Sequence, residues 1–205
     1  MSRPEYMKQI ENRILSKPKG VVFITSDFLD LADTQNVNKA LSRLAAGGVI
    51  RRIVRGVYDC PAFSELLQEY TAPDMEQVAG GIARNFGWTI VPCGDTALNL
   101  LGLSAQVPAV WQYVSDGPYR EYTIGNRVLN FKHGANKDVS GLSEKFALVV
   151  QALKALGKES IDSVMLEKLA SVLDPAERLA FLKDTQHRTA WINQVAKELL
   201  ELGWE

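Results

Sequence analysis

The most regular hydrophobic pattern of the chain lies between residues 33 and 58. Four apolar residues recur there at helical spacing: Val37, Ala40, Leu41 and Leu44. They predict an amphipathic helix that begins after Asp33, a good N-cap, and ends at Gly47-Gly48. Residues 49–54 then predict a strand, Arg55-Gly56 a turn, and Val57-Tyr58 the returning strand.

Shorter patterns flank this segment. Pro4–Ser16 predicts a first helix, whose inward residues are Tyr6, Met7, Ile10, Ile14 and Leu15. Val21–Ile24 predicts a short strand, after which Thr25 or Ser26 caps a short helix with Phe28, Leu29 and Leu31 turned inward. Residues 61–73 read as a connector, with a short helix at Phe63–Tyr70 as one interpretation of it.

A second series of elements begins near Asp74. We expect a helix from Asp74 to Asn85, a strand at Thr89–Val91 and a small helix at Asp95–Leu101. Strands are expected at Ala109–Ser115 and within Tyr119–Phe131, the latter folded at Gly125-Asn126. Apolar stripes then indicate several helices, one of which starts at Asp174-Pro175 with Glu177 at its third position.

These elements predict an α+β protein: an N-terminal winged helix-turn-helix followed by a mixed α/β domain that ends in several helices. The expected divisions are a winged helix over residues 1–60, a connector over 61–73 and a second domain over 74–205. A chain of 205 residues is long enough for both parts.

Composition adds a charge asymmetry. Residues 1–60 carry ten Lys or Arg against six Asp or Glu, whereas residues 61–205 carry thirteen against eighteen. A basic first part suggests a polyanionic partner. The absence of a long apolar run and of a signal-peptide pattern leads us to expect a cytoplasmic protein.

The predicted helix at residues 34–46 turns a polar face away from its apolar stripe. That face and its flanks carry Gln35, Asn36, Asn38, Lys39, Ser42 and Arg43. Asn and Gln pair with adenine, Arg pairs with guanine, and Lys or Ser contacts phosphate or base edges. In the strand pair, alternation sends Arg51 and Arg52 to opposite faces, and Arg55 lies at the tip. The pattern therefore predicts double-stranded DNA as a partner.

Several segments resemble a known family. SDFLDL, VNKALSRLAAGGVIRRIVRGVY and Pro61 resemble the N-terminal domain of AbiEi-type antitoxins. VPCGDTALNLLGLSAQVPAVWQYVSDGP and YTIGNRVLNFKH resemble the second domain of the shorter relatives in that family. Together these matches cover about residues 5–135, and no motif is recognised after Ser143.

The resemblance implies the antitoxin of a type IV toxin–antitoxin pair. It implies that the winged helix binds inverted repeats in its own promoter and represses it, through Thr34–Arg43 and Arg51–Arg55. It also implies that the C-terminal part neutralises a nucleotidyltransferase-like toxin of the AbiEii type, encoded nearby.

The sequence gives little support for a catalytic site. Cys60, Cys93, His133 and His187 lack zinc-ligand spacing, and no phosphate-binding glycine motif is present. Gly94–Thr96 resembles a nucleotidyltransferase turn but lacks the paired carboxylates that would hold magnesium. We therefore expect no catalytic residue, metal or cofactor.

Two other functions stay open from the residues alone. The winged helix could be a scaffold in a protein-interaction module whose acidic helical part holds a toxin or another enzyme. Alternatively, a ligand-sensing transcription factor would need a sizeable cavity within residues 74–135.

Overall fold

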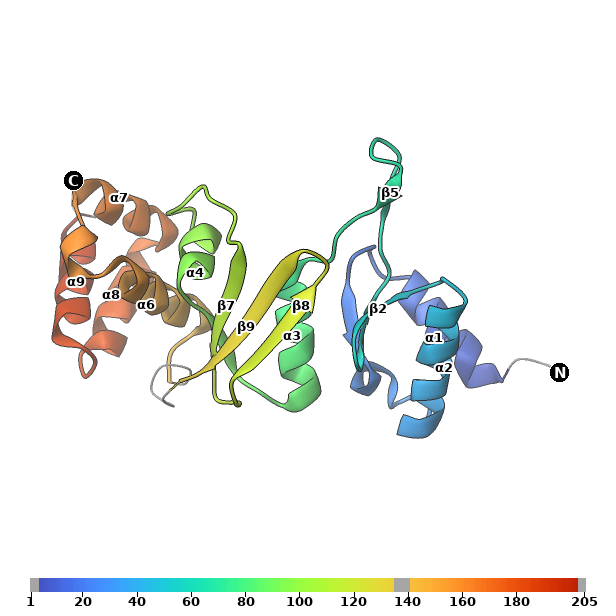
Figure 1. Cartoon of the computed structure of the whole chain (residues 1–205). Coiled ribbons are helices and arrows are strands. Elements are labelled where there is room, and N and C mark those ends of the chain that lie inside the picture. The colour runs from blue at the N-terminus through green and yellow to red at the C-terminus, as the bar shows by residue number, and fades with distance from the viewer. Residues whose placement is uncertain (1–3, 135–140, 203–205) are drawn as a thin grey trace. The chain divides into compact units, whose positions relative to one another are not determined.

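The computed structural model describes residues 4–134 and 141–202. The fold is mixed α+β, as the sequence predicts. The chain divides into two compact units (Figure 1): unit 1 holds residues 1–88 and 124–126, and unit 2 holds residues 89–123 and 127–205.

Unit 1 contains helices and a three-stranded antiparallel sheet. Its first elements are α1 (Glu5–Leu15), β1 (Val22–Ile24), the 3₁₀ turn η1 (Thr25–Phe28), α2 (Thr34–Ala46), β2 (Arg51–Val54) and β3 (Val57–Asp59). The order across the sheet is β1-β3-β2. Gly56, with φ of +83°, forms the turn between β2 and β3, where the sequence predicts it.

The predicted stripe of α2 is confirmed, because its four residues are all buried: Val37, Ala40, Leu41 and Leu44. They pack with Met7, Ile10 and Ile14 of α1, and with Phe23 of β1, in one core cluster. The side chain of Asp33 accepts a hydrogen bond from the backbone of Asn36 and caps α2 as predicted.

The second short helix differs from its prediction. It is the single 3₁₀ turn η1, and neither Thr25 nor Ser26 caps it. Instead Asp27 Oδ2 accepts a hydrogen bond from the backbone N–H of Ile24 at 2.9 Å. This bond between a side chain and the local backbone stabilises the turn. Leu29, expected inward, is exposed because a single turn has only enough length to bury Phe28. Leu15, at the end of α1, is exposed as well.

The connector at residues 61–73 forms a small hairpin rather than the short helix considered for Phe63–Tyr70. Its strands are β4 (Phe63–Ser64) and β5 (Glu69–Tyr70), which pair antiparallel. The hairpin projects from the rest of unit 1 (Figure 1). Gln68 adopts φ of +53°, which suits a tight turn and not a helix.

Helix α3 (Met75–Phe86) begins at the predicted cap, since Asp74 accepts hydrogen bonds from the backbone of Glu76 and Gln77. It packs against β1 and β3 and so lies in unit 1. Gly81 makes this packing close, because a Cβ there would lie 2.6 Å from Cγ1 of Val22. The division between the units therefore falls after Trp88, beyond the expected boundaries at residues 60 and 74.

Unit 2 begins with a four-stranded sheet and a small helix. Its elements are β6 (Ile90–Pro92), α4 (Asp95–Leu100), β7 (Val110–Ser115), β8 (Arg120–Ile124) and β9 (Arg127–His133). The strand order is β6-β7-β9-β8, with β7 antiparallel to β6 and parallel to β9. The predicted turn at Gly125-Asn126 joins β8 to β9.

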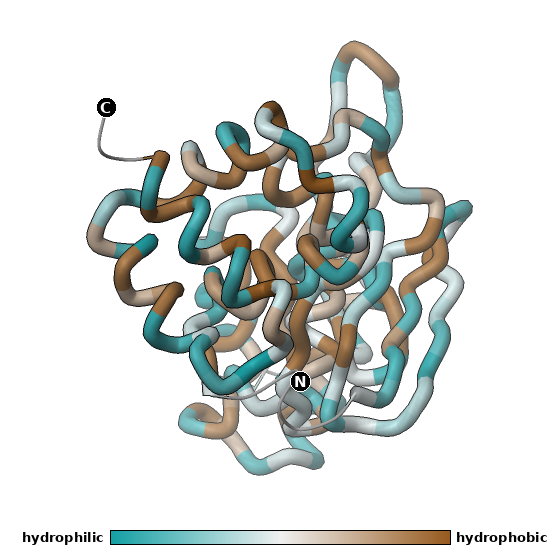
Figure 2. Tube along the Cα trace, turned by 90° about the vertical axis from the view of Figure 1, so that its left-hand side faces the viewer, coloured by the Kyte–Doolittle hydropathy of each residue, from teal (hydrophilic) through white to brown (hydrophobic). Residues whose placement is uncertain are grey.

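The remaining elements of unit 2 are helical: α6 (Glu144–Leu156), the 3₁₀ turn η2 (Lys158–Ser160), α7 (Ser163–Val172), α8 (Pro175–Thr185) and α9 (Ala190–Glu201). Figure 2 shows hydrophobic and hydrophilic segments alternating along the tube. The apolar sides of α6, α7, α8 and α9 form one core with residues of α4. Asp174 and Glu177 form the predicted capping box of α8.

Candidate functional site

The outward side of α2 carries the most concentrated set of exposed polar side chains that the sequence predicts as a site. Six of the predicted residues are exposed there: Thr34, Gln35, Asn38, Lys39, Ser42 and Arg43. Five of these, all but Thr34, line one shallow open hollow. The helix period explains the grouping, because positions 35, 38, 39, 42 and 43 lie opposite the buried stripe.

Two of the predicted polar residues have structural partners. The side-chain amide of Asn36 donates to Asp33 Oδ2 at 2.9 Å, and Asn36 Oδ1 accepts from the Tyr6 hydroxyl at 3.4 Å. This places Asn36 in the cap of α2 rather than on its outer face. Asn38 Oδ1 accepts from Thr25 Oγ1 at 2.7 Å, which ties η1 to α2 while the side chain remains exposed.

The charges on α2 are not neutralised within the described parts of the chain. Neither Lys39 nor Arg43 forms an ion pair with any residue in 4–134 or 141–202. Both side chains are exposed, one helical turn apart on the same side. Together with Gln35, Asn38 and Ser42 they form a positively charged, hydrogen-bonding surface that we call the α2 face.

The three arginines of the β2–β3 hairpin have different surroundings. Arg51 faces Asp59 in the strand register, and its guanidinium donates to both carboxylate oxygens at 3.0 and 2.5 Å. It donates further to the carbonyl of Thr71 at 2.9 Å. Arg52 is exposed on the opposite side of the strand, and Arg55 is exposed at the turn. The hairpin therefore offers Arg52 and Arg55 to an external anion, while Arg51 is engaged inside the protein.

Asp59 is a residue of this region that the sequence reasoning missed. Its side chain is fully buried, and Arg51 is its ion-pair partner. A two-residue turn alone would place Arg51 opposite Cys60, and the register shift between Arg52 and Val54 brings it opposite Asp59, so the turn pattern gave no signal for this pair.

The residues considered for catalysis occupy ordinary structural positions. Gly94 is the N-cap of α4, and the buried Thr96 hydroxyl accepts from the backbone of Gln112 at 2.7 Å. His133 Nδ1 lies 2.9 Å from the carbonyl of Gly117. Cys60 and Cys93 are buried free thiols, and burial raises the pKa of Cys93 above its usual value.

Two structural features are absent from residues 4–134 and 141–202, the part of the chain that the structure describes. No three His, Cys, Asp or Glu side chains come close enough there to hold a metal ion. No helix among those residues has the length and apolar character needed to cross a bilayer.

Comparison with known proteins gives one assignment. Residues 9–179 match the family described as "Family of unknown function (DUF6088)". The chain belongs to this family. The match begins within α1 and reaches α8, so the DUF6088 region includes the whole α2 face.

No curated protein matches this DUF6088 chain. Among solved structures, it is similar to the crystal structure of RV2827C protein from Mycobacterium tuberculosis, with 15% sequence identity and a TM-score of 0.44. That alignment covers 100% of this chain and 79% of the other.

Proposed function

We propose that this protein is a DNA-binding transcriptional regulator, in which unit 1 is a winged helix-turn-helix and α2 is its recognition helix. The observation that carries the proposal is the α2 face, where Gln35, Asn38, Lys39, Ser42 and Arg43 line one open hollow. Such side chains on one side of a well-anchored helix suit insertion into the major groove.

The arrangement of unit 1 supports this proposal. Its order is helix, strand, short turn, helix and two-stranded hairpin, and its sheet order is β1-β3-β2. A winged helix has the same element order and strand pairing, with its third helical element reading DNA and its hairpin serving as the wing, and this likeness supports the proposal. The buried stripe of α2 holds the helix on α1 and β1, so its opposite side is available to a ligand.

Each exposed residue has a role in the proposal. Gln35 and Asn38 read adenine edges, Arg43 reads guanine or binds the backbone, and Lys39 and Ser42 bind phosphate or base edges. Arg52 and Arg55 of the wing bind phosphate or the minor groove. We leave Arg51 and Asn36 out of the contact surface because Asp59 and Asp33 engage their side chains and both are only partly exposed. Asn38 is kept because it is exposed, and its hydrogen bond with Thr25 uses Oδ1 as acceptor and leaves the amide to donate. Thr34 lies at the first turn of α2, where backbone N–H groups favour a phosphate.

The antitoxin role rests on the AbiEi resemblance. In this proposal the protein binds inverted repeats at its own promoter in the cytoplasm, and unit 2 contributes to neutralising a nucleotidyltransferase-like toxin encoded nearby. The buried helical core of unit 2 fits a stably folded effector domain.

A competition gel shift tests the DNA-binding proposal. The purified protein is titrated onto the DNA directly upstream of its own gene, with scrambled DNA as competitor. A shift that survives the competitor, at about the nanomolar affinity of specific binders, is expected. If the competitor abolishes the shift, or none forms, the winged helix is a scaffold and the interaction-module hypothesis replaces this one.

A further inference from the structure

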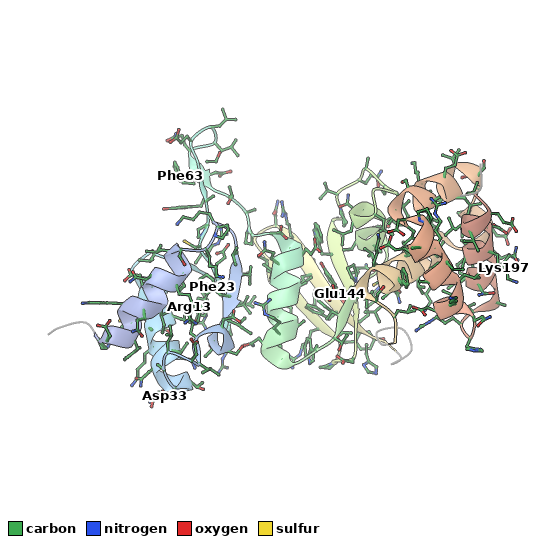
Figure 3. The ribbon with its side chains drawn as sticks, turned by 180° about the vertical axis from the view of Figure 1, so that it is seen from behind. Arg13, Phe23, Asp33, Phe63, Glu144 and Lys197 are labelled. Carbon is green, nitrogen blue, oxygen red and sulfur yellow. The ribbon has the colours of Figure 1, made fainter. Side chains whose placement is uncertain are left out.

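The β4–β5 hairpin exposes an unusual amount of apolar surface. All four of its large hydrophobic residues are exposed: Phe63, Leu66, Leu67 and Tyr70. At its apex Leu66 is 92% exposed and Leu67 is 65% exposed. Figures 1 and 3 show the hairpin, with Phe63 labelled in Figure 3, projecting away from the body of unit 1. Clustered exposed hydrophobic residues mark interaction surfaces.

The hairpin has a defined shape although it is small. At its base the backbone of Thr71 donates to Ala62 at 2.8 Å, and Arg51 donates to the carbonyl of Thr71 at 2.9 Å. The rings of Phe63 and Tyr70 meet edge to face at 5.4 Å. Near the apex the Gln68 side chain donates to the carbonyl of Glu65 at 2.6 Å. Leu66 and Leu67 are therefore presented in a preformed conformation, which reduces the entropy cost of binding.

A groove in the same unit has complementary properties. It measures about 610 Å³ and is lined by α1, the segment after it, β1 and η1. Its apolar wall includes Ile14, Val21 and Phe28, and its charged residues are Arg13, Lys17 and Asp27. Figure 3 labels Arg13 on α1.

The charge of the groove favours an acidic occupant. Arg13 forms an ion pair with Asp30, and Asp27 forms one with Arg84, so these four charges offset one another. Lys17 forms no ion pair with any residue of the described ranges and leaves the groove with an excess positive charge. The hairpin carries the opposite charge, since Glu65 and Glu69 flank its two leucines.

We propose that the β4–β5 hairpin of one molecule docks into the groove of a second copy of this chain. Leu66 and Leu67 enter the apolar part of the groove, and Glu65 and Glu69 face the side that carries Lys17. The acidic apex disfavours DNA as its partner, and its anchored base directs it away from its own unit. If each molecule docks into the other, two equal contacts close a two-fold dimer. This inference does not depend on DNA binding.

Sedimentation equilibrium of the full chain tests the association. We expect a concentration-dependent dimer whose dissociation constant rises about tenfold or more in Leu66→Asp, the effect of losing one well-buried leucine. Val107→Asp, which changes another exposed hydrophobic residue, is the matched control and should leave the constant unchanged. A wild-type chain that stays monomeric, or a Leu66→Asp chain that dimerises as the wild type does, would overturn the proposal.

Photocrosslinking identifies the docking site. A benzophenone side chain at position 66 is incorporated into ¹⁵N-labelled protein, which is mixed with unlabelled wild type before irradiation. Crosslinks from the labelled chain to residues 13–28 of an unlabelled chain are expected. Crosslinks confined to the same chain would show that another part of the molecule covers the hairpin, and crosslinks elsewhere on the second copy would assign a different interface. Either result would refute hairpin-to-groove docking.

Discussion

Arg51 of β2 and Asp59 of β3 form a bidentate ion pair, with nitrogen–oxygen distances of 3.0 and 2.5 Å. The carboxylate of Asp59 is fully buried, whereas Arg51 is partly exposed. Removing the guanidinium would leave a buried negative charge without its partner, and this situation is costly. The pair therefore stabilises the hairpin that carries Arg52 and Arg55.

Arg51→Met is expected to lower the free energy of unfolding by about 2 kcal/mol, a modest value because Arg51 itself is partly exposed. Arg52→Met, one residue away on the opposite side of the strand, should change it by less than about 0.5 kcal/mol. Urea denaturation followed by circular dichroism measures both. Equal effects of the two substitutions would mean that the ion pair does not support the hairpin.

Adjacent glycines in α3 provide a second test. Gly81→Ala would place a methyl group 2.6 Å from Val22, and the stiff valine cannot rotate away freely. We expect a loss of about 1–3 kcal/mol of stability from this overpacking. Gly80 has no atom within 4 Å of the corresponding position, so Gly80→Ala should be neutral or stabilising by up to about 1 kcal/mol. Thermal denaturation compares the two variants, and a harmless Gly81→Ala would contradict the close contact between α3 and β1.

The capping carboxylate of α8 predicts a dependence of stability on pH. The Lys145 ammonium, followed by the backbone N–H of Asp174, lowers the pKa of Glu177 below its usual 4.5. A lowered pKa in the folded state stabilises the protein above the unfolded value, and this contribution disappears as pH falls through the folded value.

Glu177→Gln should therefore lose less stability than the wild type between about pH 6 and pH 3. Melting temperatures across this range measure the difference. Glu167→Gln, a change at an exposed glutamate of α7, is the control and should follow the wild-type profile. Parallel profiles for the wild type and Glu177→Gln would show that the ion pair with Lys145 has no energetic role.

Base-reading and phosphate-binding residues should differ in their effects on DNA affinity. Gln35→Ala is expected to weaken binding to the operator about tenfold while binding to scrambled DNA stays constant. Arg55→Ala should weaken both by a similar factor, since a phosphate contact carries no sequence information. Fluorescence anisotropy on the two DNAs separates the cases. The assignment of Gln35 would be wrong if its substitution reduced both affinities equally.

Local patterns in the sequence predicted most elements, because capping and periodicity act over a few residues. The cap at Asp33, the stripe from Val37 to Leu44 and the turn at Gly56 are of this kind. The placement of α3 in unit 1 was not predictable in this way, since it depends on the contact between Gly81 and Val22, which are far apart in sequence.

The candidate site, too, was predictable only where it depends on local sequence patterns. Helical periodicity predicted which side of α2 is exposed, and the structure brings Gln35, Lys39 and Arg43 together there. Residue type alone could not separate Arg51 from Arg52, because their difference comes from the cross-strand partner Asp59. The hairpin at Phe63–Tyr70 was missed because each of its strands has only two residues, too few for the alternation that identifies a strand in a sequence.

The most direct test of the central claim is a salt-dependent DNA titration of Lys39→Ala/Arg43→Ala beside the wild type. Lys197→Ala serves as the charge control, because Lys197 lies exposed on α9 in unit 2 (Figure 3). We predict that the double variant loses specific affinity and that its slope of log K against log salt falls by about one unit for each phosphate contact removed. An affinity and a slope equal to those of the wild type and the control would contradict DNA binding by the α2 face.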